Sequence, residues 1–139
     1  MLKVNIGALK DQQETLARQA KFEDTFEEIK YIAGFSVFFK KNTCVCAAAV
    51  LDFKTMKVVE HKFIVTKAEM NYLPGLEAFR EGPSICQLYY DLEYEPDIII
   101  VTGHGADHPM RCGLATFVGV ELGKPTVGVA KTLIAGEER

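Results

Sequence analysis

The side chains with the clearest chemical potential lie between positions 102 and 112, in the sequence TGHGADHPMRC. His104, His108 and Cys112 are spaced four residues apart, which on a helix would place three metal ligands on one face. The proline and the two glycines of this stretch disfavour a continuous helix, and no second pair of cysteines or histidines stands at zinc-finger spacing. The pattern therefore favours a glycine-rich turn that its histidines shape by hydrogen bonding, with a zinc site as the weaker interpretation.

A second polar stretch, NYLPGLEAFREG, covers residues 71–82. Tyr72 and Pro74 predict a stiff apolar protrusion ahead of a helix, and Glu81 lies in that helix beside a Gly-Pro pair. Lys131 follows the last predicted strand, where a lysine is placed to contact a phosphate. Taken one at a time, these residues are typical of packing (Tyr72), of a solvated helix carboxylate (Glu81) and of ordinary surface (Lys131). The chain has no phosphate-binding GKT or GKS motif, no dinucleotide-binding glycine pattern and no serine nucleophile elbow.

The composition is that of a single globular domain. With 139 residues, 48% hydrophobic and 25% charged, the chain is long enough for one domain, over residues 1–139, and short for two. The net charge of −3 argues against a protein that coats nucleic acid without specificity, because such binding neutralises phosphates with cations. The four cysteines are typical of buried reduced thiols. With no secretory leader and no apolar run near the ~20 residues of a membrane helix, we expect a cytoplasmic protein with no membrane partner.

Hydrophobic periodicity predicts three strands in succession and then an alternation of helix and strand. A helix is predicted over the first thirty residues, where Leu9, Gln13, Leu16 and Ala20 recur at helical spacing among polar residues. The predicted strands cover residues 31–39, 44–53 and 58–65, followed by a helix at 76–92, a strand in PDIIIVT, a helix at 112–122 closed by Gly123, and a strand in KPTVGVA. Pro83 is expected to bend the helix at 76–92 or to start a new one. The uninterrupted apolar runs at 44–53 and in PDIIIVT predict strands covered on both faces.

This order of elements predicts an α/β fold built on one mixed sheet. Short connections join the first three strands as antiparallel hairpins, and the strand–helix–strand units that follow predict right-handed crossovers to two parallel strands. Helices are expected on both faces of the sheet. Ligands of such sheets lie beyond the carboxyl ends of the central parallel strands. The loop that begins after Thr102 lies at such an end, so chemistry is expected there.

Four ordered motifs together resemble the endonuclease V family, from about Gln13 to Leu133. They are YIAGFSVFF, NYLPGLEAFRE, PDIIIVTGHGADHPMRCGLA and GKPTVGVAKTL. The resemblance implies a ribonuclease H-like fold, in agreement with the order of elements. It also implies an enzyme that cuts the backbone of DNA or RNA one nucleotide beyond a deaminated base, typically inosine. The family uses Mg²⁺ held by acidic residues of the first strand, the helix and the fourth strand.

Only one of these three acidic positions of the family is acidic in this chain. Glu81 matches the family's catalytic glutamate, whereas Ser36 and Thr102 stand where the family has the aspartates of the first and fourth strands. Mg²⁺ requires hard anionic oxygen ligands, and it then activates a water molecule and stabilises charge on the phosphate. A hydroxyl supplies no negative charge, so the resemblance predicts weakened Mg²⁺ binding. Phe117 is a further departure, at a position where the family often has a histidine.

Other matched positions imply a nucleic-acid-binding surface. The resemblance assigns a strand-separating wedge to Tyr72, Leu73 and Pro74, a contact near the scissile phosphate to Lys131, the loop after the fourth strand to His104 and His108, and close backbone approach to a flipped base to Gly103, Gly105 and Gly113. The chain stops at Arg139, soon after the fifth strand. We therefore expect it to lack the family's downstream segment, which adds an active-site residue and part of the nucleic-acid surface.

Three functions are open at this point. The first is a degenerate family member that has lost Mg²⁺-dependent cleavage and retains weak binding of DNA or RNA around a deaminated base. The second is an active Mg²⁺-dependent endonuclease with a rearranged site, in which Asp107 and His108 replace the missing ligands. The third is a scaffold or subunit without enzymatic activity, whose exposed surface binds a partner protein or a second copy as a homo-oligomer. The two missing carboxylates favour the first.

Overall fold

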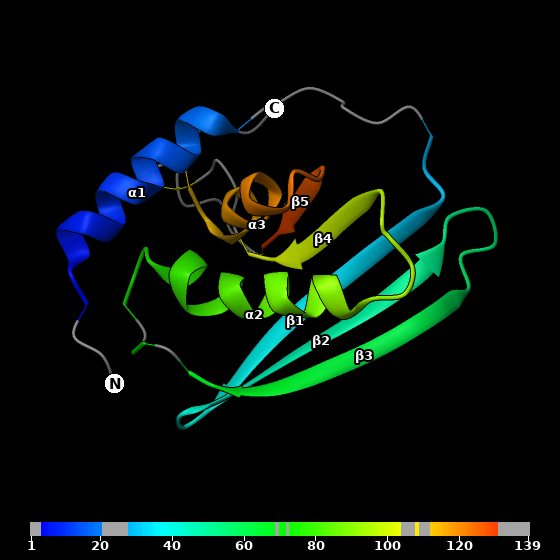
Figure 1. Ribbon diagram of the computed structural model, residues 1–139, viewed down its shortest axis with the longest axis horizontal. Helices are drawn as coiled ribbons and strands as arrows, with labels where there is room; N and C mark the ends of the chain where they lie inside the picture. The colour runs from blue at the N-terminus through cyan, green and yellow to red at the C-terminus, as the bar shows by residue number, and fades with distance from the viewer. Residues whose placement is uncertain are drawn as a thin grey trace.

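The computed structural model describes residues 4–20, 28–68, 70–71, 73–103, 108 and 112–130. Along the chain its elements are α1 (Ile6–Gln19), β1 (Tyr31–Lys40), β2 (Thr43–Asp52), β3 (Val58–Lys67), α2 (Glu77–Asp91), β4 (Ile98–Thr102), α3 (Leu114–Leu122) and β5 (Thr126–Val129) (Figure 1). Every predicted strand is confirmed, and so are the two later helices. The first helix, predicted over the first thirty residues, covers only Ile6–Gln19, and residues 4–5, 20 and 28–30 lie outside it. None of the helices in these ranges is long and apolar enough to cross a membrane.

The five strands form one mixed sheet in the order β3-β2-β1-β4-β5. β1 pairs with β2, and β2 with β3, as antiparallel strands joined by short turns. β4 pairs in parallel with β1 and with β5. The predicted arrangement of three antiparallel strands followed by two parallel strands is therefore confirmed, and the carboxyl end of β4 lies beside the middle of β1.

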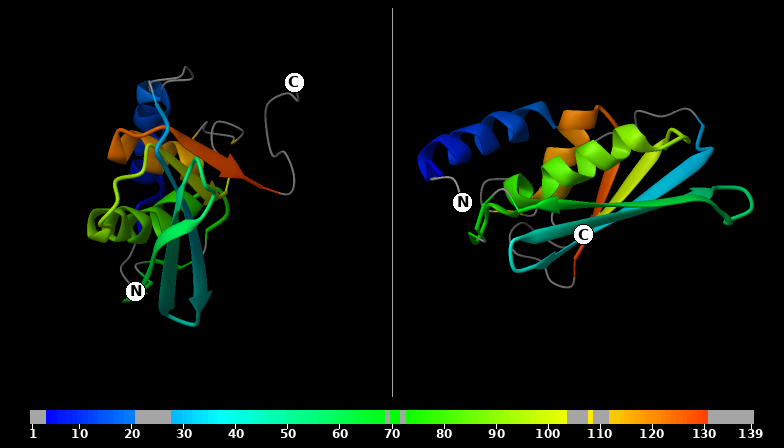
Figure 2. Two further views of the ribbon diagram at one scale, coloured as in Figure 1. Left: turned by 90° about the vertical axis from the view of Figure 1, so that its right-hand side faces the viewer. Right: turned by 60° about the horizontal axis from the view of Figure 1, so that its bottom comes forward.

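The three helices lie on one face of the sheet, as the right-hand view of Figure 2 shows. α2 packs on β1, β2 and β3, while α3 packs on α1, α2, β4 and β5. The strand residues beneath the helices alternate with exposed or half-buried ones, and Phe35 of β1 and Val101 of β4 are among those that are buried. This alternation places the hydrophobic core between the sheet and the helices.

No helix among the described residues covers the opposite face of the sheet (Figure 2), which departs from the predicted helices on both faces. The apolar runs of β2 and β4 predicted burial on both faces, yet Ala47 and Thr102 are exposed. An apolar run predicts that its side chains are buried, because burial lowers their free energy. It does not specify which element covers them. We call this surface the open face, and its members include Ser36, Phe38, Ala47, Phe63, Val65, Thr102, Val127 and Val129.

The helix α2 continues through Pro83, so the predicted start of a new helix at this proline is wrong. Burial of its neighbours Gly82, Ser84 and Ile85 offsets the backbone hydrogen bond that proline removes. Gly82 is required here because a Cβ at this position would overlap the ring of Phe117 on α3. The end of α3 agrees with the sequence, since Gly123 closes it with a left-handed φ of 63°.

Candidate functional site

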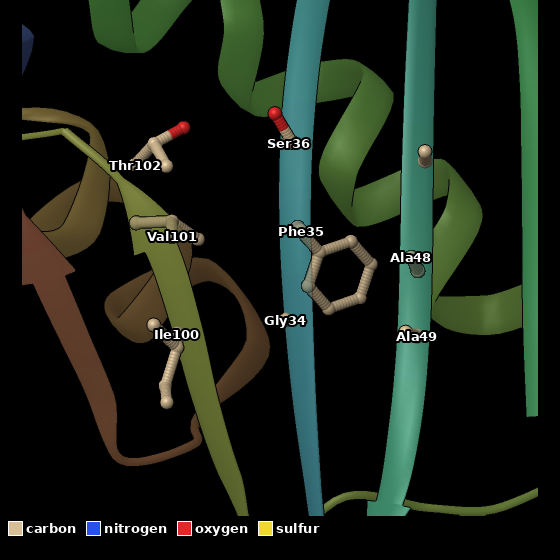
Figure 3. Close-up of a pocket in the computed structure, with 9 residues that line it drawn as sticks. Gly34, Phe35, Ser36, Ala48, Ala49, Ile100, Val101 and Thr102 are labelled. Carbon is tan, nitrogen blue, oxygen red and sulfur yellow. The ribbon is translucent and has the colours of Figure 1, made fainter. Parts of the chain in front are cut away.

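Thr102 at the end of β4 lies beside Ser36 in the middle of β1, on the open face. The parallel register of β1 and β4 pairs Phe35 with Val101, so the next residues of the two strands also lie side by side. Both Ser36 and Thr102 are exposed, and Figure 3 shows their hydroxyl groups pointing toward the space between the strands. The structure therefore brings together the two positions that the sequence matched to metal-binding aspartates.

A shallow hollow of about 390 Å³ extends from these hydroxyls across the open face. Residues 34–36 of β1, 47–49 of β2 and 100–102 of β4 line it (Figure 3). Small or apolar residues such as Gly34, Ala47 and Ile100 make most of this lining, and Ser36 and Thr102 contribute its polar side chains. A hollow of this composition suits an apolar or uncharged group better than a dication.

Glu81 lies on the helix-covered side of the sheet, in α2. Its side chain is half-buried. Burial raises the pKa of the Cys46 thiol, and the neighbouring thiols and the charge of Glu81 raise it further. Cys46 is fully buried in the core beneath the helices, so Glu81 lies near that covered face of β2. Ser36 and Thr102 project from the opposite face.

These three positions do not fit a Mg²⁺ ion. Its octahedral shell needs anionic oxygens that converge on one point, whereas Ser36 and Thr102 offer neutral hydroxyls. Burial raises the pKa of Glu81 to about 7, with a further increase from Glu77 and an opposing effect of Arg80. Within the described ranges, no group of three or more His, Cys, Asp or Glu side chains could hold a metal ion.

The elevated pKa of Glu81 predicts a pH-dependent stability. The unfolded carboxyl ionises near pH 4.5, whereas the folded one keeps its proton up to about pH 7. The free energy of unfolding should therefore fall as pH rises between these values, because the folded state binds the extra proton. We expect Glu81→Gln to be nearly neutral at pH 4 and to stabilise the chain by about 1–2 kcal/mol at pH 8, after allowance for solvent screening.

Urea unfolding of both proteins at pH 4 and pH 8 measures this difference. The exposed carboxylate of Glu121 on α3 provides the matched control, and Glu121→Gln should change stability little at either pH. An equal gain from Glu81→Gln at both pH values would show that its carboxyl is not destabilised by burial.

The turn ahead of α2 is held by two buried side chains. The carbonyl oxygen of Gly75 accepts hydrogen bonds from Gln13 Nε2 at 2.9 Å and from His108 Nε2 at 2.8 Å. Gln13 Nε2 also donates to the carbonyl oxygen of Cys112 at 3.0 Å, so α1 is tied both to the turn and to the start of α3. The prediction that a histidine shapes this region by hydrogen bonding agrees with His108. Sequence reasoning missed Gln13, whose helical spacing was its only signal.

The remaining positions matched to nucleic-acid binding are described in part. Leu73 is half-buried and Pro74 is exposed in the turn. A Cβ at Gly103 would come within 3.0 Å of Leu114, so this glycine lets the end of β4 pack closely on α3, and the buried Gly113 precedes that helix. The predicted site residues Tyr72, His104, Gly105, Asp107 and Lys131 lie outside the described residues.

Phe117 serves the core instead of the site. It is buried in α3, and its ring meets that of Phe79 edge to face at a centroid distance of 5.6 Å. Together with the close approach of Gly82, this contact locks α2 against α3. The position therefore contributes packing where a histidine would contribute a polar group.

A five-stranded mixed sheet of this order, with its candidate site where the end of β4 meets β1, defines a ribonuclease H-like α/β protein. The family model of Endonuclease V matches residues 14–139. The chain belongs to the Endonuclease V family.

Sequence and structure comparisons give similar relatives. Endonuclease V of Rippkaea orientalis is 39% identical over 127 residues, which cover 90% of this chain and 56% of the relative. Endonuclease V of Ignicoccus hospitalis is 38% identical over 128 residues, covering 91% and 60%. A variant of Ciona intestinalis Endonuclease V, in complex with a 23mer DNA containing an inosine followed by a ribo-adenosine, has a TM-score of 0.88 and 30% identity, covering 96% of this chain and 60% of that chain. This chain therefore spans less than two thirds of the length of these relatives.

Proposed function

We propose that this chain is a nucleic-acid-binding member of the Endonuclease V family that does not carry out Mg²⁺-dependent cleavage. The observation that carries the proposal is the pair of neutral hydroxyls, Ser36 on β1 and Thr102 at the end of β4, side by side. Glu81 lies on the helix-covered side with an elevated pKa. Among the described residues, these two strand positions thus supply none of the negative charge that holds a dication and supports activation of water.

The binding half of the proposal is supported by the turn ahead of α2. Leu73 and Pro74 belong to the stretch matched to the wedge, and hydrogen bonds from Gln13 and His108 fix the carbonyl of Gly75 just after them. The Ciona intestinalis relative forms a complex with an inosine-containing DNA. The proposed ligand is therefore a single-stranded or locally opened DNA or RNA that contains a deaminated base. With a net charge of −3, binding should be weak and should weaken further with salt.

The cleavage half is tested with inosine-containing DNA and RNA oligonucleotides incubated with Mg²⁺ or Mn²⁺. Neither the native chain nor Glu81→Ala is expected to cut them, because the ligands for the metal are missing. A longer family member, run in parallel, serves as the positive control. Robust cutting by the native chain that disappears in Glu81→Ala would overturn the proposal.

The binding half is tested by fluorescence anisotropy with the same oligonucleotides. Tyr72→Ala should weaken binding about tenfold, because stacking of a base on an aromatic ring contributes about 1–3 kcal/mol. Lys131→Ala should reduce the slope of log affinity against log salt concentration by about 1, the effect of losing one phosphate contact. The matched controls are Tyr90→Ala on α2 and Lys54→Ala in the β2–β3 turn, both exposed. If all four variants bind as the native chain does, the assigned surface is wrong.

A further inference from the structure

The buried amide of Gln13 joins two segments that are far apart in the chain. Its Nε2 donates one hydrogen bond to the carbonyl oxygen of Gly75 at 2.9 Å and another to that of Cys112 at 3.0 Å. Gly75 belongs to the turn ahead of α2, and Cys112 lies just before α3. Because one nitrogen bonds both oxygens, these oxygens lie no more than about 6 Å apart. One side chain of α1 therefore holds the two segments close together.

Glutamine is well suited to this bridge. Its amide nitrogen carries two hydrogens, so Gln13 serves two carbonyl groups with a single side-chain conformation. Gln13 is only 1% exposed, so water does not compete for these hydrogen bonds, and they are stronger than they would be at the surface. Its Oε1 accepts no hydrogen bond from the described residues. The amide therefore acts here as a double donor.

The turn ahead of α2 is anchored through one residue, Gly75. Its carbonyl oxygen also accepts from His108 Nε2 at 2.8 Å, and its N–H donates to Glu77 Oε1 at 3.2 Å. Its φ of 83° lies in the left-handed region, which favours glycine. Together with the bond from Gln13, these contacts fix the backbone directly after the two described residues matched to the wedge.

The second segment leads to a position matched to a flipped base. Cys112 is fully buried and is followed by Gly113, which the family match assigns to close approach of the base. His108 lies in the same connection between β4 and α3, and it bonds directly to Gly75. Gln13 ties the end of this connection to the same carbonyl. The stretch matched to the wedge and the segment matched to the base therefore belong to one hydrogen-bonded unit.

We propose that Gln13 is a positioning residue for nucleic-acid binding. It holds the turn ahead of α2 and the start of α3 in one fixed relation, so that strand separation by the turn and capture of the base occur together. The physical reason is preorganisation, since a binding surface whose parts are already in place loses less freedom when it binds. The inference rests on the proposed function and deepens it, because it adds a buried residue of α1 to the site.

The test compares binding of an inosine-containing DNA duplex with binding of the same strand alone. Gln13→Met keeps the length of the side chain and removes both donors. A duplex must be opened before its base is bound, whereas a single strand need not be. Gln13→Met should therefore weaken binding of the duplex about tenfold more than binding of the single strand, measured by fluorescence anisotropy. A fluorescent purine analogue beside the inosine, which brightens when it is unstacked, should report less opening at saturation.

Two control variants separate positioning from stability. Gln12→Met is the matched control, because Gln12 is an exposed glutamine of the same helix, and it should bind both forms as the native chain does. Leu16 is buried in α1, and Leu16→Val loosens its packing without removing a hydrogen bond. Leu16→Val should lower stability in urea unfolding but leave the ratio of duplex affinity to single-strand affinity unchanged.

Hydrogen exchange tests the coupling without nucleic acid. The amides of Leu76 and Phe117 make backbone hydrogen bonds in the turn ahead of α2 and at the start of α3, respectively. Gln13→Met should speed exchange of both amides by about tenfold, because it frees the two segments together. Gln12→Met should change neither.

The possible failures are distinguishable. If Gln13→Met changes the two affinities by the same factor, or speeds exchange in one segment alone, the positioning role is wrong and the proposed function stands. If the native chain binds neither the duplex nor the single strand, the proposed function is wrong and the positioning role falls with it. Circular dichroism checks folding. If Gln13→Met does not fold, Gln13→Asn, which keeps the amide on a shorter side chain, replaces it with the same expectations.

Discussion

The double substitution Ser36→Asp, Thr102→Asp is expected to create a divalent-cation site where the end of β4 lies beside the middle of β1. Neighbouring strands lie about 4.8 Å apart, and both side chains point toward the space between them (Figure 3). Two carboxylates there would converge on one cation and supply the anionic oxygens that the hydroxyls lack. We expect Mn²⁺ binding to tighten by about tenfold or more, measured by calorimetry and by the rise in melting temperature with added Mn²⁺.

The matched control is Ser36→Asn, Thr102→Asn, which adds side chains of nearly the same shape without charge. It should bind Mn²⁺ no better than the native chain, since the neutral amide oxygen is the weaker ligand for a hard dication. If both variants bound Mn²⁺ more tightly by the same factor, missing negative charge would not be the cause of weak binding at the native site. If the aspartate variant gains nothing, missing charge does not explain the proposed absence of cleavage.

Local sequence signals are sufficient for the element order and the sheet topology. Because turns of a few residues join them, three successive strands pair with their neighbours in the chain. Right-handed crossovers then determine the order of the parallel strands. The left-handed conformation of Gly123 was likewise predictable, because glycine closes helices at little conformational cost. The same order places Thr102 at the ligand-binding end of the sheet, beside Ser36.

Contacts between distant segments were beyond the reach of the sequence. Gln13 bonds to Gly75 and Cys112, which are 62 and 99 residues away along the chain, and its own spacing in α1 predicted only a buried helix face. The position of Glu81 on the helix side depends on how α2 packs on β2, which no local pattern specifies. The sequence also did not predict a face that no described helix covers, because an uninterrupted apolar run predicts a strand covered on both faces.

Gly82→Ala is expected to lower the free energy of unfolding by about 2 kcal/mol, a cost typical of overpacking a filled core. The added Cβ would overlap the ring of Phe117, and that ring is confined by burial and by its edge-to-face contact with Phe79. Alanine forms helix more readily than glycine by about 1 kcal/mol, so the measured loss is what remains after this gain. Urea unfolding of the two proteins measures the difference.

Gly34→Ala provides the matched control, because a Cβ at Gly34 on β1 meets nothing within 4 Å. It should leave stability nearly unchanged, which separates the loss of a glycine from the clash at Gly82. Phe117→Leu shortens the opposing side chain, so the cost of Gly82→Ala should be smaller in that background, with a coupling of about 1 kcal/mol in a double-mutant cycle. If the two substitutions lower the free energy of unfolding additively, the Phe117 ring is not the reason that glycine is required at position 82. The close packing of α2 on α3 would then depend on other contacts.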